Sequence, residues 1–188
     1  MIEKLKKTSD FLKELSENKQ LYSSVNITRE YLIQGIEKNG KILVCGNGGS
    51  ATQASHMVGE LVGRFAFDRP PLPAISLFDL AATTAIGNDY GYNEIYSRFV
   101  DSLGDSNSVL FSISTSGNSE NCIKAMESAK KKGVINIGLL GKDGGKMKDL
   151  ADIAIIIPHN ETPLIQEIHL MVIHWLCQEI EKHFFKNP

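Results

Sequence analysis

The fold is decided by the stretch Lys41-Ile42-Leu43-Val44-Cys45-Gly46-Asn47-Gly48-Gly49-Ser50. Its first half is a short apolar run that ends in a cluster of glycines, and a helical pattern follows from Ser50 to about Val62. A strand that is apolar throughout is typical of a sheet buried on both faces. A glycine turn that joins such a strand to a helix predicts a βα unit of a parallel sheet.

The same alternation continues along the chain. Further strands are predicted at 73–78, 108–114, 134–140 and 153–157, and helices at 79–86, 93–103, 119–132, 146–150 and 162–185. Two helical patterns, in residues 5–15 and 25–36, precede the first strand. We therefore expect an α/β fold, a doubly wound five-stranded parallel sheet sandwiched by helices, with an N-terminal helical hairpin. Residues 1–188 are predicted to form a single domain, with the hairpin in 1–40 and the α/β core in 41–188.

Composition restricts the class of protein. With 188 residues, 42% hydrophobic and 22% charged, the chain can bury one core and is too short for two full α/β domains. A formal net charge of −2 does not indicate a nucleic-acid-binding surface, and no apolar stretch approaches the ~20 residues of a membrane span. The charged N-terminus lacks a secretory signal, and three scattered cysteines are typical of a reducing compartment. We expect a cytoplasmic protein with no nucleic-acid or membrane partner.

One loop has the features of an anion site. Ligands of open parallel sheets bind beyond the carboxyl ends of the strands, so the loops after Cys45, Phe78, Ser114 and Leu140 are expected to share one edge. The segment 114–120 offers four hydroxyls at the start of a helix, where unpaired amides and the helix dipole favour a phosphate. A simple helix cap would need only one hydroxyl. The segment 141–146 resembles a phosphate loop, but its spacing indicates a solvated turn.

The glycine loop permits three interpretations. Residues 46–51 satisfy the G-x-G-x-x-A pattern of dinucleotide-binding folds, which also requires an acidic residue about 20 positions further on. The nearest candidate, Asp79, follows Gly46 by 33 residues, so this match is weak. The loop is otherwise a tight turn needed for close packing, or a place where the backbone and Asn47 approach a sugar.

Two helices carry groups suited to acid–base or metal chemistry. His56 and Glu60 are four residues apart and therefore lie on one face of a helix. In the last helix, Gln166 and His174 are eight residues apart and share a broad face, whereas His169 is displaced from both. Each set is equally compatible with ordinary polar or hydrogen-bonded core residues. The pattern alone does not decide between these alternatives. The turn at Asn88-Asp89 is likewise explained by the end of a helix as well as by a ligand contact.

Taken together, these segments resemble the sugar isomerase (SIS) domain family and, within it, the phosphoheptose isomerases. They span nearly the entire chain in the order found in that family. The matching segments are 45–50, His56 with Glu60, 87–91, 114–119, 140–145, 166–169 and His174. The serine-rich segment is shared by SIS proteins at large, and the combination of His56, Glu60, Gln166 and His174 is the specific part.

The resemblance implies a role for individual residues. The metal ligands would be His56, Glu60, Gln166 and His174, which would hold one zinc ion per subunit, with Glu60 as catalytic base and His174 as catalytic acid. Substrate binding would fall to Asn47, Gly48, Gly49, Glu60, Asn88, Asp89, Ser114, Thr115, Ser116, Ser119 and Gln166. The resemblance also implies a homo-oligomer, a tetramer with active sites at the subunit interfaces.

The implied reaction converts sedoheptulose 7-phosphate to D-glycero-D-manno-heptose 7-phosphate, the first step of ADP- or GDP-heptose synthesis for lipopolysaccharide or another surface glycan. A carboxylate would move a proton between C1 and C2 through an enediol(ate), with an imidazole acting at the oxygen and zinc stabilising its charge. Two alternatives are a non-catalytic SIS module that binds a phosphosugar or a protein partner, and a nucleotide-dependent oxidoreductase. A non-catalytic SIS module would not need the four metal ligands. A nucleotide-dependent oxidoreductase would need an acidic residue about 20 positions after the glycine loop, and the candidate Asp79 lies too far along the chain.

Overall fold

The computed structural model describes residues 1–185; the last three residues of the predicted domain, 186–188, lie outside the described residues. The strands are β1 (Ile42–Gly46), β2 (Ala74–Ser76), β3 (Val109–Ser114), β4 (Ile135–Gly141) and β5 (Ile153–Ile157). The helices are α1 (Ile2–Ser16), α2 (Lys19–Glu37), α3 (Gly49–Val62), α4 (Leu80–Asp89), the 3-10 helix η1 (Tyr92–Glu94), α5 (Ile95–Leu103), α6 (Glu120–Lys132), α7 (Met147–Leu150) and α8 (Thr162–Phe184).

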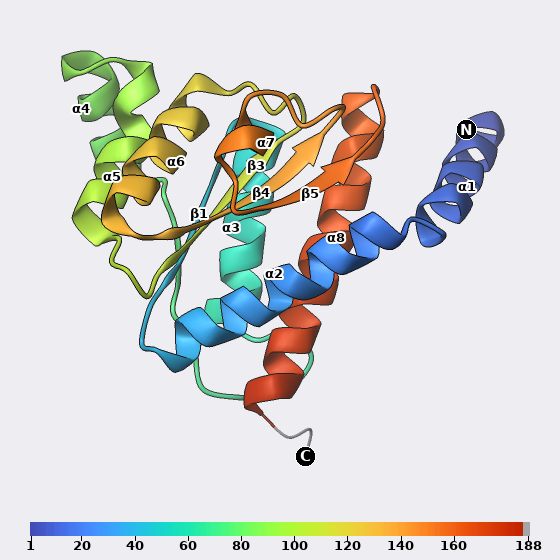
Figure 1. Ribbon diagram of the computed structural model, residues 1–188, viewed down its shortest axis with the longest axis horizontal. Helices are drawn as coiled ribbons and strands as arrows, with labels where there is room; N and C mark the ends of the chain where they lie inside the picture. Colours follow the sequence, from blue (N-terminus) through green and yellow to red (C-terminus); the bar gives the residue numbers. More distant parts are fainter. Residues whose placement is uncertain (186–188) are drawn as a thin grey trace.

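The five strands form one parallel sheet in the order β2-β1-β3-β4-β5, which confirms the predicted fold class. The strand order reverses between β1 and β3, so the chain winds in both directions from that point. One core packs α2, α3 and α8 on one face of the sheet, and a second packs α5, α6 and α7 on the other (Figure 1). Both faces are therefore covered, as the apolar strands require.

The N-terminal helices differ from a closed hairpin. The chain turns sharply at Asn18, whose side chain caps α2 by accepting a hydrogen bond from the Leu21 amide at 2.9 Å. From that turn α1 points away from α2 and rests on the beginning of α8 through Phe11 (Figure 1). The strand predicted at 73–78 is shorter than expected because β2 is an edge strand that pairs only with β1. Among residues 1–185, no helix combines the length and apolar character needed to cross a membrane.

His169 is a buried polar residue in α8. Its side chain has no solvent exposure, and neither ring nitrogen makes a hydrogen bond of ordinary geometry, although the ring lies near the Leu140 carbonyl. Burial lowers the pKa of His169 to about 4, because the charged imidazolium would lose its hydration. The side chain is therefore neutral at pH 7 and belongs to the core.

This burial predicts a specific pH dependence of stability. In the unfolded chain His169 binds a proton below a pH of about 6.5. In the folded chain it binds this proton only when the pH approaches 4. His169 should therefore remove about 3 kcal/mol of stability as the pH falls from 7 to 4. Denaturant unfolding at several pH values should show a weaker acid dependence for His169→Leu than for the wild type. The exposed control His183→Gln should keep the His169 contribution, and equal slopes for wild type and His169→Leu would contradict the assignment.

Candidate functional site

The glycine loop and the serine loop lie at the carboxyl edge of the sheet, where the chain leaves β1 and β3. β1 and β3 pair in register, from Ile42 with Val109 to Gly46 with Ile113, so the two strands end side by side. Their helices, α3 and α6, then cover opposite faces of the sheet (Figure 1). The loops that leave a sheet at such a point separate and leave room for a ligand between them.

The loop after β3 presents its hydroxyls to one another. Ser114 Oγ lies 3.0 Å from Ser119 Oγ and 3.4 Å from Ser116 Oγ, and it accepts a hydrogen bond from the Gly117 amide at 3.1 Å. Ser119 occupies the N-cap position of α6, but its hydroxyl does not cap the helix. The first-turn amides of α6 are thus left without a serine cap, which favours a bound anion over a plain cap.

The segment 141–146 supports the serine loop and is more than the solvated turn predicted from its spacing. The Lys146 amide donates to Asn118 Oδ1 at 3.1 Å, and the Met147 amide donates to the Gly117 carbonyl at 2.9 Å. Gly117 has a φ of +64°, and a Cβ at this position would overlap the Gly144 carbonyl. Only glycine permits this contact, so the two loops are fixed against each other.

The glycine loop is tied to α6 through Asn47. The Asn47 and Asn121 side chains exchange two hydrogen bonds of 2.8 Å, and the Tyr92 hydroxyl donates to Asn47 Oδ1 at 2.9 Å. Tyr96 donates its hydroxyl to the Gly46 carbonyl. Asp79 caps α4 by accepting from the Ala82 amide at 2.8 Å, which gives this carboxylate a structural role and further weakens the dinucleotide interpretation.

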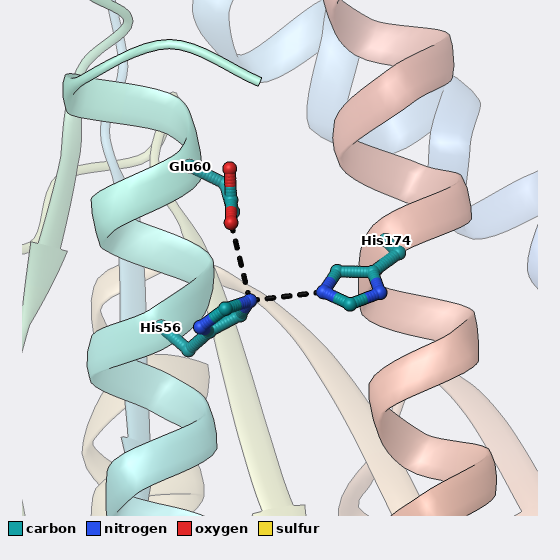
Figure 2. A group of neighbouring side chains, drawn as sticks. All are labelled: His56, Glu60 and His174. Carbon is teal, nitrogen blue, oxygen red and sulfur yellow. Dashed lines mark hydrogen bonds and ion pairs between the residues drawn. The ribbon is translucent and has the colours of Figure 1, made fainter. Parts of the chain in front are cut away.

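His56 and Glu60 of α3 meet His174 of α8 (Figure 2). His56 Nε2 lies 2.9 Å from His174 Nε2 and 3.2 Å from Glu60 Oε1. His56 is exposed, and Glu60 and His174 are half-buried, so the group is open to solvent and to a ligand. The structure thus joins residues that are 118 positions apart in the sequence.

The donor set fits a metal ion. One donor atom from each of the three side chains lies within 4.8 Å of the others. Ligands about 2.0–2.1 Å from a tetrahedral zinc ion are separated by about 3.4 Å, so small side-chain adjustments would admit the ion. Cys177 of α8 lies close to Glu60 of α3. Burial raises the pKa of its thiol to about 12, and the charge of Glu60 contributes to a smaller extent. The group that lies together in residues 1–185 consists of two imidazoles and one carboxylate, so its donors are nitrogen and oxygen, as in catalytic zinc sites.

Gln166, Asn88 and Asp89 make their observed contacts with other residues. The Gln166 amide packs on Gly49, in the first turn of α3 and about two turns before His56. Its main-chain carbonyl accepts a hydrogen bond from Gln53 at 2.7 Å. Asn88 and Asp89 are exposed at the end of α4, where the Asn88 amide donates to the Asp89 carboxylate at 2.8 Å. Their roles as ligand and substrate contacts stay predictions.

Comparison with known proteins identifies the family. The family model described as "SIS domain" matches residues 5–141. The chain is 51% identical over 183 residues to the phosphoheptose isomerase of Helicobacter pylori strain P12, covering 97% of this chain and 91% of the relative. The chain belongs to the phosphoheptose isomerases of the SIS domain family. It is therefore an isomerase, which favours the enzymatic interpretation over a non-catalytic SIS module.

Solved structures of the family have the same architecture. The phosphoheptose isomerase of Neisseria gonorrhoeae superimposes with a TM-score of 0.89 at 37% identity, covering 96% of each chain. The phosphoheptose isomerase of Francisella tularensis gives a TM-score of 0.91 at 34% identity, covering 96% of this chain and 95% of that one. The sugar isomerase resemblance seen in the sequence is confirmed.

Sequence reasoning missed the residues that support the site. Asn121 and Tyr92 hold Asn47, but in the sequence they are an ordinary first-turn helix residue and a loop tyrosine. Asn121 could have been noticed because it follows the serine loop directly, in the first turn of α6. Tyr92 gives no comparable signal because its contact depends on how α4 and η1 fold over the sheet edge.

The Asn47–Asn121 pair predicts a stability effect. Asn121 is 2% exposed, and its Oδ1 also accepts the Cys122 amide at 3.0 Å. Asn121→Ala would leave these buried groups unpaired and should lower the free energy of unfolding by about 1–3 kcal/mol. Asn107→Ala, which removes an exposed hydrogen bond to the Lys38 carbonyl, is the matched control with an expected loss below about 0.5 kcal/mol. Equal denaturation midpoints for the two variants would contradict the prediction.

Proposed function

We propose that this isomerase interconverts sedoheptulose 7-phosphate and D-glycero-D-manno-heptose 7-phosphate, with zinc assistance, as the first step of ADP- or GDP-heptose synthesis. Relatives named phosphoheptose isomerase support a role in heptose synthesis. The observation that carries the specific reaction is the convergence of His56, Glu60 and His174 on one point. A module that only binds a phosphosugar would need the serine loop and no such group.

The substrate would lie between the two loops and along α3. The serine loop, Ser114 to Ser119, would bind the phosphate through hydroxyls and through the first-turn amides of α6. Asn47, Gly48, Gly49 and Gln166 would contact the sugar at the start of α3. His56 is seven residues after Gly49, or about 10 Å along the helix axis, which suits a long sugar chain held at its phosphate end. Binding at the phosphate would fix the position of the reacting carbons.

The proton transfer would fall to Glu60 and His174. The Glu60 carboxylate would remove the proton from one of the two reacting carbons and return it to the other through an enediol(ate). The His174 imidazole would give and take the proton at the sugar oxygens. One zinc ion per subunit, held by His56, Glu60, His174 and Gln166, would supply Lewis-acid stabilisation of the developing oxygen charge.

A homotetramer with active sites at subunit interfaces is part of the proposal. It is supported by α4, which has no buried residue: its first residue, Leu80, is 71% exposed, and Asn88 and Asp89 are exposed at its other end. An apolar groove between the N-terminal helices and α8 offers a second surface for a neighbouring subunit; it includes Leu15, Val25, Ile168, Met171 and Trp175. Asn88 and Asp89 would then complete a site across such an interface. A cytoplasmic location stays a prediction from the sequence.

Replacement of Glu60 tests the proposed chemistry. Glu60→Gln keeps the shape but removes the base, so kcat should fall at least about 100-fold while the circular dichroism spectrum is unchanged. Turnover of sedoheptulose 7-phosphate and bound zinc should be measured on the same samples. The matched control is Glu179→Gln on α8, whose carboxylate pairs with Lys182 and should be dispensable. Wild-type turnover by Glu60→Gln would refute the role of Glu60, and a wild-type enzyme that retains no zinc and resists chelators would refute zinc assistance.

Replacement of Ser119 tests the phosphate loop. Ser119→Ala removes a hydroxyl that donates to a charged group, so KM should rise about 10- to 100-fold with little change in kcat. Ser106→Ala, at an exposed serine in the loop before β3, is the matched control and should leave both constants unchanged. A variant in which kcat falls and KM is unchanged would show that the phosphate lies elsewhere.

A further inference from the structure

A buried ion pair lies behind the His56–Glu60–His174 group. Arg69 belongs to the segment between α3 and β2, and Glu181 lies in the second-last turn of α8. Arg69 Nε and Glu181 Oε1 are 3.1 Å apart, and each side chain is 1% exposed. A buried ion pair gives little net stability compared with apolar side chains of similar size, so stability alone does not account for this pair.

Arg69 holds the end of α3. Its guanidinium donates from Nη2 to the carbonyl of Glu60 at 2.7 Å, and from Nη1 to the carbonyls of Leu61 at 2.6 Å and Gly63 at 3.1 Å. The last carbonyls of a helix have no partner within the helix, and a positive charge there is favourable. Arg69 is therefore bonded to the backbone of Glu60, the residue that supplies the carboxylate of the group.

Glu181 supports the part of the His56–Glu60–His174 group that contains His174. Its carboxylate accepts hydrogen bonds from the amides of Phe65 at 3.0 Å and Ala66 at 2.8 Å, in addition to Arg69 Nε. The Phe65 ring packs against the His174 ring, with centroids 6.0 Å apart. Glu181 thus fixes the backbone of the aromatic residue that borders His174.

We propose that Arg69 and Glu181 are positioning residues that set the separation of α3 and α8 at the His56–Glu60–His174 group. The inference rests on the proposed function of that group. A metal or proton-transfer site shared by two helices works only when its donors keep a fixed separation, and neither helix determines that separation alone. The ion pair connects the backbone of Glu60 to α8 directly, and it places Phe65 against His174.

The test uses two variants of the full chain because a single charge deletion would leave an unpaired buried charge. Arg69→Lys keeps the charge opposite Glu181 but replaces the planar guanidinium and its five donors by one ammonium group, which cannot reproduce the same spread of bonds to Glu181 and the helix carbonyls. The double variant Arg69→Met with Glu181→Met replaces the pair by apolar groups of similar length. Zinc affinity is measured by competition with a chromophoric chelator, and the absorption spectrum of the cobalt-substituted protein reports ligand geometry. Both are combined with kcat and KM for sedoheptulose 7-phosphate.

A positioning role predicts 10- to 100-fold weaker zinc binding, a changed cobalt spectrum and a lower kcat, with KM nearly unchanged because the serine loop is untouched. The matched control is Met126→Ala, a fully buried residue of α6 on the opposite face of the sheet. It should lose thermal stability but keep zinc affinity and kcat. Folded variants with zinc affinity and kcat within twofold of the wild type would overturn this inference and leave the proposed function standing. A wild-type protein that neither binds zinc nor isomerises the substrate would overturn the proposed function, and the inference with it.

Discussion

The parallel pairing of β1 with β3 is the constraint on which the site depends. Five consecutive residue pairs, from Ile42 with Val109 to Gly46 with Ile113, bring the two strands to an end at the same edge. The glycine loop and the serine loop therefore start next to each other. Because the following helices cover opposite faces of the sheet, the two loops leave its edge in different directions, which is the arrangement at which open α/β sheets bind ligands. The Asn47–Asn121 hydrogen bonds then cross between the two βα units.

The helix α3 links the two parts of the site. It begins at the glycine loop and carries His56 and Glu60 in its later turns, where α8 brings His174 (Figure 2). Parallel pairing fixes the beginning of α3, whereas its far end depends on contacts made beyond the sheet, including the hydrogen bond from the Leu72 amide to the Leu61 carbonyl. The fully buried Arg69 and Glu181 add support through backbone carbonyls and amides. The same end of α3 thus receives both the functional carboxylate and its structural support.

The neutral and the titratable groups of the candidate site lie in different places. The serine loop presents neutral hydroxyls and amides, so in the proposed reaction it would bind the phosphate without placing a cation near the reacting carbons. The imidazole and carboxylate groups lie further along α3, where proton transfer needs groups that titrate. The donor atoms that lie together there are those of two imidazoles and one carboxylate, which are nitrogen and oxygen.

The sequence by itself determined the α/β class, the strand and helix order and the serine loop, because these depend on local periodicity and on residues within one βα unit. It also placed His56 and Glu60 on one helix face, since four-residue spacing is a local property of helices. Only the tertiary structure decided that His174 joins them, that α1 splays away from α2, and that Arg69, Glu181 and Asn121 support the site. The contacts of Asn47 with Asn121, of Arg69 with Glu181 and of His56 with His174 join residues 74 to 118 positions apart. Packing between helices and loops selects them, and no local sequence pattern encodes that packing.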